Sequence, residues 1–437
     1  MTNLIKDIGH QRISEFRPFK PSSMPALLLT LILAITPLLT SAKNRERQEW
    51  VLDSIKLPPG FKIEYYADNV PEATSMTLSP SGVIFVGTKR LGKVYAIQDV
   101  DGDKFTDRVI TVAEGLDRPN GVAYLNGDLF IAEISKISKI KDIENNLHRW
   151  HKPVIITDSL PKDRLHGTRY IAISPEGWLY IAVGAPCNTC VSPDPYATIL
   201  RMQPDGSQAE IYARGVRYCL GMAFHPETHA LWFTCNSRNS ISDVNPGDEL
   251  NCAPNQGMHF GHPYVIGDNI PDKEFEHAIK PGCRFYPPAL KLEAHVNLGG
   301  LCFYNASQFP EKYQGKAFIC EGGTTHAQRA SGFKISVVDP KKGRESSQET
   351  FAEGWRGFYD EVLGRPTDIL VHHDGSLLVS DSFAGCIYRI SYNPDLVDVP
   401  PKGQRLVDNK NYNDESPHSP RRLPEQLPGP TSFALDQ

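Results

Sequence analysis

His166 and Arg217 are the two side chains of this sequence best suited to chemistry on a small molecule. His166 lies in the segment LHGTRY (165–170), directly before an alternating apolar stretch. Neutral imidazole is the usual proton acceptor near pH 7. Arg217 lies in ARGVRY (213–218), and the arginine fork suits carboxylates and oxyanions. The alternative interpretations are a histidine that caps a turn and an arginine in a surface ion pair.

A pair of cysteines follows the next apolar stretch, in GAPCNTC (184–190), and all nine cysteines lie at or after residue 187. The spacing of Cys187 and Cys190 predicts a local disulfide, because a tight loop of this length brings the two Cβ atoms within bridging distance. A catalytic dithiol is the alternative. A zinc site is disfavoured, because no second CxxC motif is present.

Acidic residues at two places could supply oxygen ligands to calcium. Asp248 and Glu249 lie in PGDELN (246–251), shortly after CNSR (235–238). The stretch DVDGDKFTD (99–107) has the ligand spacing of a calcium loop, but it also suits a polar hairpin turn, which we favour.

Composition limits the classes of protein that could position these residues. Of the 437 residues, 40% are hydrophobic and 22% charged, which excludes an intrinsically disordered chain. The net charge of −5 gives no sign of a nucleic-acid partner. The 34 Gly, 35 Pro, 17 Tyr and 19 Phe favour strands joined by turns.

Six segments repeat one pattern, an alternating apolar stretch, a turn and a second alternating stretch, which is typical of a β-hairpin. They are 76–98, 121–140, 171–184, 221–235, 301–320 and 368–390. Their spacing of about 45 to 60 residues is that of propeller blades. We therefore predict an all-β, six-bladed β-propeller over 59–392, the alternative being an irregular all-β domain. The wider interval at 240–300 should form loops over the channel mouth, on the same rim as His166.

The two ends of the chain differ from this body. Residues 24–42 are apolar and uncharged, follow Arg12, Arg17 and Lys20, and end in Thr-Ser-Ala. This predicts a signal peptide or a signal anchor over 1–42 and a secreted or periplasmic protein, with no other membrane contact. Residues 43–58 lead into the propeller. Residues 393–437 are rich in Pro, Asn, Asp and Ser, which predicts a disordered tail.

Several of these motifs occur in the order found in one known family. The segments are HGTRYIAISPEGWLYIAVGAPCNTC (166–190), ARGVRY through DELN (213–251), HFGHPY (259–264), PPALKL (287–292) and 364–390. In this order they resemble the soluble glucose/sorbosone dehydrogenases that depend on pyrroloquinoline quinone (PQQ), in particular the branch like L-sorbosone dehydrogenase. The resemblance covers about residues 59–392 and implies a six-bladed propeller.

The resemblance also implies a function: a quinoprotein that oxidises a sugar, sugar aldehyde or related alcohol, with PQQ and Ca²⁺ at the channel mouth. His166 would be the general base, and Arg217 would stabilise charge on the quinone oxygen. The electron acceptor would be a cytochrome or a quinone. The expected cofactor contacts are Asn120, Arg217, Asn236, Arg238, Arg329 and Arg365. The expected calcium ligands are the loop carbonyls of Ser237 and Arg238, with Asp248 and Glu249.

The sequence departs from the family pattern at four places. Tyr218 replaces an asparagine, Cys235 an aspartate and Ser237 a glycine, and the segment 320–328 lacks the family's Trp-Asn-Arg group. Arg329 could supply the missing cation. Two alternatives therefore remain: a non-catalytic propeller that binds a partner through a degraded cofactor site, and a calcium-dependent hydrolase of the lactonase type.

Overall fold

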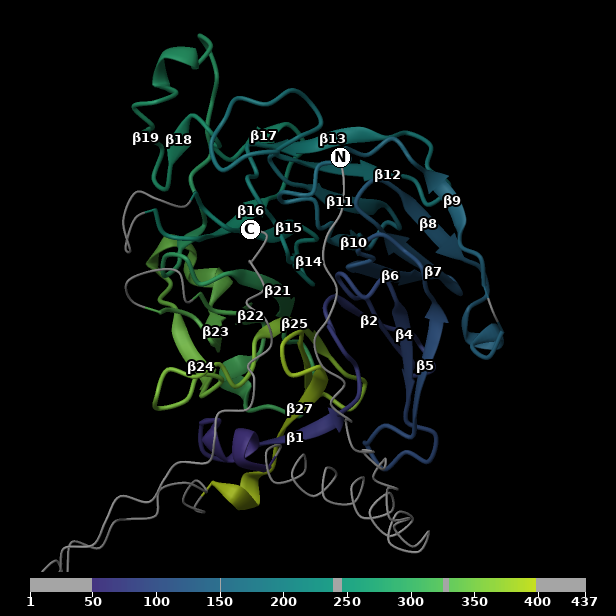
Figure 1. Cartoon of the computed structure of the whole chain (residues 1–437). Helices are drawn as coiled ribbons and strands as arrows, with labels where there is room; N and C mark the ends of the chain where they lie inside the picture. The colour runs from purple at the N-terminus through teal and green to yellow at the C-terminus, as the bar shows by residue number, and fades with distance from the viewer. Residues whose placement is uncertain (1–48, 150, 239–245, 325–329, 398–437) are drawn as a thin grey trace, which may run out of the picture. The chain divides into compact units, whose positions relative to one another are not determined.

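The computed structural model of the chain describes residues 49–149, 151–238, 246–324 and 330–397. The predicted all-β fold is confirmed: six antiparallel sheets form the six blades of a β-propeller, which follow one another around a ring in Figure 1. All six repeated segments of the sequence form hairpins within these sheets.

The first three blades span residues 76–214. Blade 1 consists of β2 (Met76–Leu78), β3 (Ile84–Val86), β4 (Val94–Gln98) and β5 (Arg108–Ala113). Blade 2 consists of β6 (Gly121–Leu125), β7 (Asp128–Ala132), β8 (Ile137–Ile140) and β9 (Val154–Thr157). Blade 3 consists of β10 (Ile171–Ile173), β11 (Leu179–Val183), β12 (Thr198–Met202) and β13 (Glu210–Arg214).

The other three blades complete the ring. Blade 4 consists of β14 (Met222–Phe224), β15 (Leu231–Cys235), β16 (Glu249–Ala253) and β20 (Leu290–Lys291). Blade 5 consists of β21 (Leu298–Phe303), β22 (Ala317–Glu321), β23 (Lys334–Val338) and β24 (Glu349–Glu353). Blade 6 consists of β25 (Pro366–Val371), β26 (Leu377–Asp381), β27 (Cys386–Tyr392) and β1 (Phe61–Ala67).

Two sets of contacts close the ring. The first strand of each blade contacts the first strand of the next, and β2 of blade 1 contacts β25 of blade 6. The outer strand of blade 6 is β1, which pairs with β27 in antiparallel register, Phe61 opposite Tyr392. The first and last long strands of the propeller therefore share one sheet, as Figure 1 shows, and this leaves fewer unpaired strand edges than an open ring would have.

The cores lie between neighbouring blades, and alternation within single strands builds them. In β3, Ile84 and Val86 pack in the cluster between blades 6 and 1, whereas Phe85 packs in the cluster between blades 1 and 2. Successive side chains of a strand point to opposite faces of its sheet, so each buried strand contributes to two cores. Six such clusters, one for each blade interface, occur among the described residues.

The interval 240–300 contains more than the predicted loops. Beyond β16 and β20, β17 (Met258–His259) adds a parallel fifth strand to blade 3, beside β13. A separate hairpin joins β18 (Val265–Ile266) to β19 (Ile270–Pro271). Period-2 patterns of two residues are too short to detect in a sequence, so these strands were not predicted.

The predicted terminal segments fall mostly outside the described residues. Residues 1–42 lie outside them, as does the tail from residue 398 onward, although a short 3₁₀-helix spans Pro394–Leu396. Within the described part of the chain, no helix is both long and apolar enough to cross a membrane.

Candidate functional site

His166 lies in a turn just before β10 and has a hydrogen-bonding pattern that suits a base. Its side chain is 3% exposed, and its Nδ1 lies 2.8 Å from the carbonyl oxygen of Ala185. A carbonyl oxygen only accepts, so Nδ1 must carry the hydrogen and donate it. The neutral ring then keeps its lone pair on Nε2. Burial, with the positive charge of Arg217, lowers the pKa of His166 to about 4, so the ring is neutral at pH 7.

Gly184, which follows β11, allows His166 to take this position. A Cβ atom at residue 184 would lie 2.6 Å from the Cβ of His166, closer than real Cβ atoms approach. The loop that begins at Gly184 is closed by the Cys187–Cys190 disulfide, which confirms that prediction. The tight start of this loop places the carbonyl of Ala185 against the imidazole.

Arg217 connects this disulfide loop to blade 4. Its Nε donates to the backbone oxygen of Asn188 (2.9 Å) and its Nη2 to the side-chain oxygen of Asn188 (2.8 Å). Its Nη1 donates to the carbonyl of Asn236 (3.1 Å). The side chain is 4% exposed, and burial lowers its pKa to about 10. The structure thus gives Arg217 a positioning role, while its charge also acts on His166.

Tyr218 packs directly on the predicted base. The ring centroids of Tyr218 and His166 are 4.7 Å apart, and the ring planes are inclined by 34°. Burial raises the pKa of the Tyr218 hydroxyl, while the charges of Arg118 and Arg217 act in the opposite direction. Tyr218 therefore packs against the imidazole and lies near both arginines.

Three cationic side chains, Lys89, Arg118 and Arg365, make up a group that we call the cationic rim. Burial lowers the pKa of Lys89, the nearby Glu72 carboxylate acts in the opposite direction, and the charges of Arg365 and Arg118 lower it further. Arg365 donates to the carbonyl of Gly322 (3.0 Å) and lies over the Phe333 ring, 5.0 Å from its centroid. Like charges in partly buried positions repel, so a ligand with several negative charges would relieve this group.

The two predicted asparagine contacts serve the propeller itself. The Asn120 amide donates to the carbonyl of Arg169 (2.9 Å) and connects neighbouring blades. The side-chain amide of Asn236 forms two hydrogen bonds with the backbone of Leu298. Its Oδ1 accepts from the N–H (2.7 Å), and its Nδ2 donates to the carbonyl (2.9 Å). Direct contact of these amides with a cofactor stays a prediction.

The predicted calcium ligands lie where β15 ends and β16 begins: Ser237 and Arg238 follow β15, Asp248 directly precedes β16, and Glu249 is its first residue. Asp248 is 1% exposed. Its two oxygens accept the backbone N–H groups of Ser237 (2.8 Å) and Val296 (2.9 Å), and burial raises its pKa to about 6. Glu249 accepts from Asn251 (3.2 Å), and burial raises its pKa to about 7. These bonds make Asp248 a support of the loop at 236–238, and its role as a direct ligand stays a prediction.

The two remaining predicted arginine contacts have different outcomes. Arg238 forms ion pairs with Asp272 and, at 3.4 Å, with Glu274. These pairs join the segment after β15 to the segment after β19. Arg329 and residues 325–328 of the altered segment lie outside the described residues, whereas residues 320–324 are described.

The acidic hairpin at 99–107 matches both interpretations of the sequence. Side-chain oxygens of Asp99, Asp101 and Asp107 lie within 4.8 Å of one another. The same carboxylates cap backbone N–H groups of their own turn, for example Asp99 with Gly102 (2.8 Å). Self-capping of this kind is ordinary for a polar turn.

Three residues of the candidate site were not predicted from the sequence. Lys89 lies in the turn after β3, and Arg118 lies two residues before Asn120. His262 belongs to the HFGHPY segment, and burial, followed by the charges of Arg217 and His166, lowers its pKa to about 3. Their position at strand ends was the available signal, because propeller ligands lie at the ends of strands.

Known sugar dehydrogenases are among the proteins to which this chain is similar. The E. coli (strain K12) protein named aldose sugar dehydrogenase YliI is 31% identical over 124 residues, 27% of this chain and 30% of that protein. The holo form of the pyranose dehydrogenase PQQ domain from Coprinopsis cinerea superposes with a TM-score of 0.64 at 14% identity, over 77% of this chain and 97% of that one. At this identity the structural match shows a shared fold.

Two further matches extend over most of the chain. An uncharacterised protein of Borreliella burgdorferi is 30% identical over 380 residues, 84% of this chain and 96% of that protein. The family model described as "Domain of unknown function (DUF7133)" matches residues 47–411. The chain therefore belongs to the DUF7133 family.

Proposed function

We propose that this chain is a quinoprotein dehydrogenase that oxidises a sugar, sugar aldehyde or related alcohol, with PQQ as its cofactor and His166 as its general base. The observation that carries this proposal is the tautomer of His166. Because Ala185 takes the Nδ1 hydrogen, the Nε2 lone pair is available to a substrate hydroxyl. The PQQ enzyme with the same fold supports the choice of cofactor.

The cationic rim fits the proposed cofactor. PQQ carries three carboxylates, and burying them without positive partners would be costly. Lys89, Arg118 and Arg365 come from three different turns of the ring. Burial lowers the pKa of Lys89, and the charges of the two arginines add to this effect against the opposing Glu72 carboxylate. These three side chains would hold the carboxylates. When bound, PQQ supplies the acceptor for the hydride that leaves the substrate carbon.

The protein's own contribution is to bind the substrate and accept a proton. His166 Nε2 would accept the proton of the substrate hydroxyl, since carbon-bound hydride leaves only as that proton is removed. Tyr218 fixes the plane of the imidazole through the ring contact. Arg217 ties the disulfide loop to the carbonyl of Asn236 with three of its N–H groups, two to Asn188 and one to Asn236, and the guanidinium has five. The two that remain could stabilise negative charge that develops at the site.

A reconstitution experiment tests the proposal. Purified protein is incubated with PQQ and CaCl₂, passed over a gel-filtration column and assayed by dye reduction with a panel of aldoses. We expect the protein to retain quinone absorbance and to reduce dye with at least one sugar. His166→Gln should retain PQQ but lose about 10²–10⁴-fold in turnover. Arg217→Ala should weaken both binding and turnover, because the loop loses its anchor.

The matched control is His148→Gln, which changes a histidine that is exposed and should leave turnover unchanged. If the wild-type protein does not retain PQQ, the proposal is wrong. A binding module or a calcium-dependent lactonase would then be favoured, and hydrolysis of simple lactones in CaCl₂ separates these two. Normal turnover of His166→Gln would overturn the assignment of the base.

A further inference from the structure

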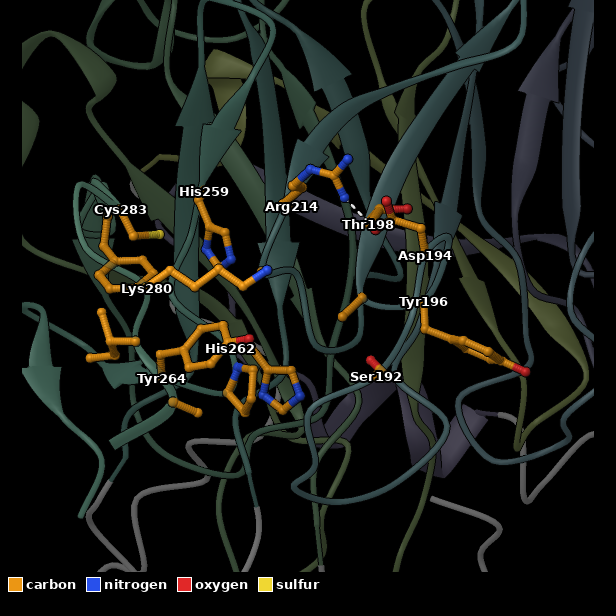
Figure 2. Close-up of a pocket in the computed structure, with 16 residues that line it drawn as sticks. Ser192, Asp194, Tyr196, Thr198, Arg214, His259, His262, Tyr264, Lys280 and Cys283 are labelled. Atoms are coloured by element: carbon orange, nitrogen blue, oxygen red, sulfur yellow. Dashed lines mark hydrogen bonds and ion pairs between the residues drawn. The ribbon is translucent and has the colours of Figure 1, made fainter. Parts of the chain in front are cut away.

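A cavity of about 460 Å³ lies between the outer strands of blade 3 and the segment 259–285 (Figure 2). This volume is within the range of small-molecule sites. Three parts of the chain line it: the loop after the disulfide (192–198), the end of β13 with Gly215, and residues of 259–285. None of the lining residues belongs to the cationic rim, so the cavity is distinct from the proposed cofactor site.

One wall of the cavity is aromatic. The His259 ring lies 5.0 Å from the Phe285 ring and 5.9 Å from the Tyr264 ring. The Tyr264 and Phe285 rings stack at 5.9 Å, with their planes inclined by 28°. Flat rings of this kind offer apolar faces together with polar edges, which suits a ligand that has C–H groups on one side and hydroxyls at its rim.

The remaining lining residues, which we call the polar side of the cavity, carry an excess of positive charge. Asp194 is the single carboxylate among the described lining residues, and it is paired with Arg214. Lys280 extends into the cavity in Figure 2 and forms no ion pair with any residue that the structure describes. The cavity therefore has one uncompensated positive charge, in a chain whose net charge is −5.

The two cavity histidines are neutral hydrogen-bonding groups. The Nδ1 of His259 accepts the N–H of Gly261 (3.1 Å), so its Nε2 carries the hydrogen and can donate. Burial lowers the pKa of His259 to about 4. The buried Nε2 of His262 has no hydrogen-bond partner within the described part of the chain. An unpaired buried polar atom is costly, and a ligand hydroxyl could satisfy it.

His262 also connects the cavity to the proposed catalytic residues. Besides lining the cavity, it lies near enough to Arg217 and His166 for their charges to act on it. Its backbone N–H also donates to the carbonyl of Gly215 (3.2 Å), two residues before Arg217, so the cavity lies beside the segment that carries Arg217.

We propose that this cavity binds a sugar ring that carries a carboxylate, a uronic acid unit, as the remote part of the substrate. Lys280 and the donors of the polar side would bind the carboxylate and hydroxyls, and the aromatic wall would contact the C–H face. The link to oxidation rests on the function proposed above, whereas binding to the cavity does not.

Cys283 provides a readout that needs no turnover. It lines the cavity, and it is the exposed free thiol among the described cysteines, the others being buried or partly buried. We would measure its alkylation rate by iodoacetamide with peptide mass mapping, at increasing concentrations of D-glucuronate. Parallel titrations use D-glucose, which lacks the carboxylate, and acetate, which lacks the ring.

We expect D-glucuronate to protect Cys283 at concentrations at least about tenfold below those of glucose or acetate, because a charge-assisted bond adds to the ring contacts. Lys280→Ala should weaken this protection at least about fivefold. Lys273→Ala, which removes an exposed lysine of the same segment that does not line the cavity, should not. Phe285→Ala should weaken protection by glucuronate and glucose alike.

Three results would overturn the proposal: equal protection by acetate and glucuronate, equal protection by glucose and glucuronate, or protection that Lys280→Ala leaves unchanged. Failure of the proposed oxidation looks different. In that case glucuronate protects Cys283, but the PQQ-treated protein reduces no dye with any sugar, and the cavity remains a uronate site without that chemistry.

Discussion

A buried neutral histidine makes folding sensitive to acid, and His166 gives this effect a definite size. Its pKa falls from 6.5 to about 4 in the folded protein, chiefly by burial. Between these values the unfolded chain binds more protons than the folded one, so the free energy of unfolding decreases as the pH falls. At 1.36 kcal/mol per pH unit, the full effect of His166 is about 3 kcal/mol.

The prediction is that His166→Gln removes this part of the pH dependence. Urea unfolding of both proteins at pH 8 and pH 5 gives the comparison. By pH 5 the wild-type protein should lose about 2 kcal/mol more stability than the variant, by the same linkage. Other buried groups titrate in both proteins: His259 in the same direction, and Glu321 and Asp368 in the opposite one. They cancel in the difference.

His148→Gln is the control, since it replaces an exposed histidine and leaves His166 unchanged, and it should follow the wild-type profile. If the profiles of wild type and His166→Gln differ by less than about 0.5 kcal/mol, the folded protein protonates His166 as easily as the unfolded chain does. Burial would then not keep a proton off Nε2, and the assignment of His166 as a base that stays neutral would be wrong.

Three further predictions concern the same rim of the propeller. Gly184→Ala should lower the melting temperature and abolish dye reduction, because the new Cβ would lie 2.6 Å from that of His166; scanning calorimetry and the dye assay check this. Arg365→Ala should weaken PQQ affinity about 10-fold or more and reduce its salt dependence, since one charge-assisted contact is lost; equilibrium dialysis at two salt concentrations measures both. Cys187→Ser should raise KM clearly while lowering the melting temperature only slightly, because the disulfide closes a short loop next to the site; steady-state kinetics and calorimetry measure the two effects.

The propeller was predictable from sequence because its information is local. Each hairpin, such as 76–98, combines period-2 apolar residues with a turn, and the two faces of a strand are both buried against neighbouring blades. The closing strand β1 was not predicted, because its partner β27 lies more than 300 residues away in the chain. No local pattern in 61–67 identifies that partner.

The site was predictable only where a motif carried it. His166, Arg217 and the Cys187–Cys190 bridge lie in segments with recognisable order, and the structure gathers them around one loop. Lys89 and Arg118 lie in ordinary-looking turns, and only the closure of the ring brings Lys89 near Arg365. Neutral, buried and exposed forms of the same residue type look identical in a sequence.

The hydrogen bonds of Arg217 and Asn236 show why the proposed site should be rigid. Both side chains are used to connect neighbouring loops and blades, and Arg217 and Tyr218 also surround the imidazole of His166. A substitution at Arg217 therefore changes two things at once, the charge next to the base and the position of the loop that supplies Ala185. The first effect should change the pH profile, and the second should change affinity. Arg217→Lys, which keeps the charge but not the fork of donors, separates them: it should preserve the acid limb of the activity profile while weakening ligand binding.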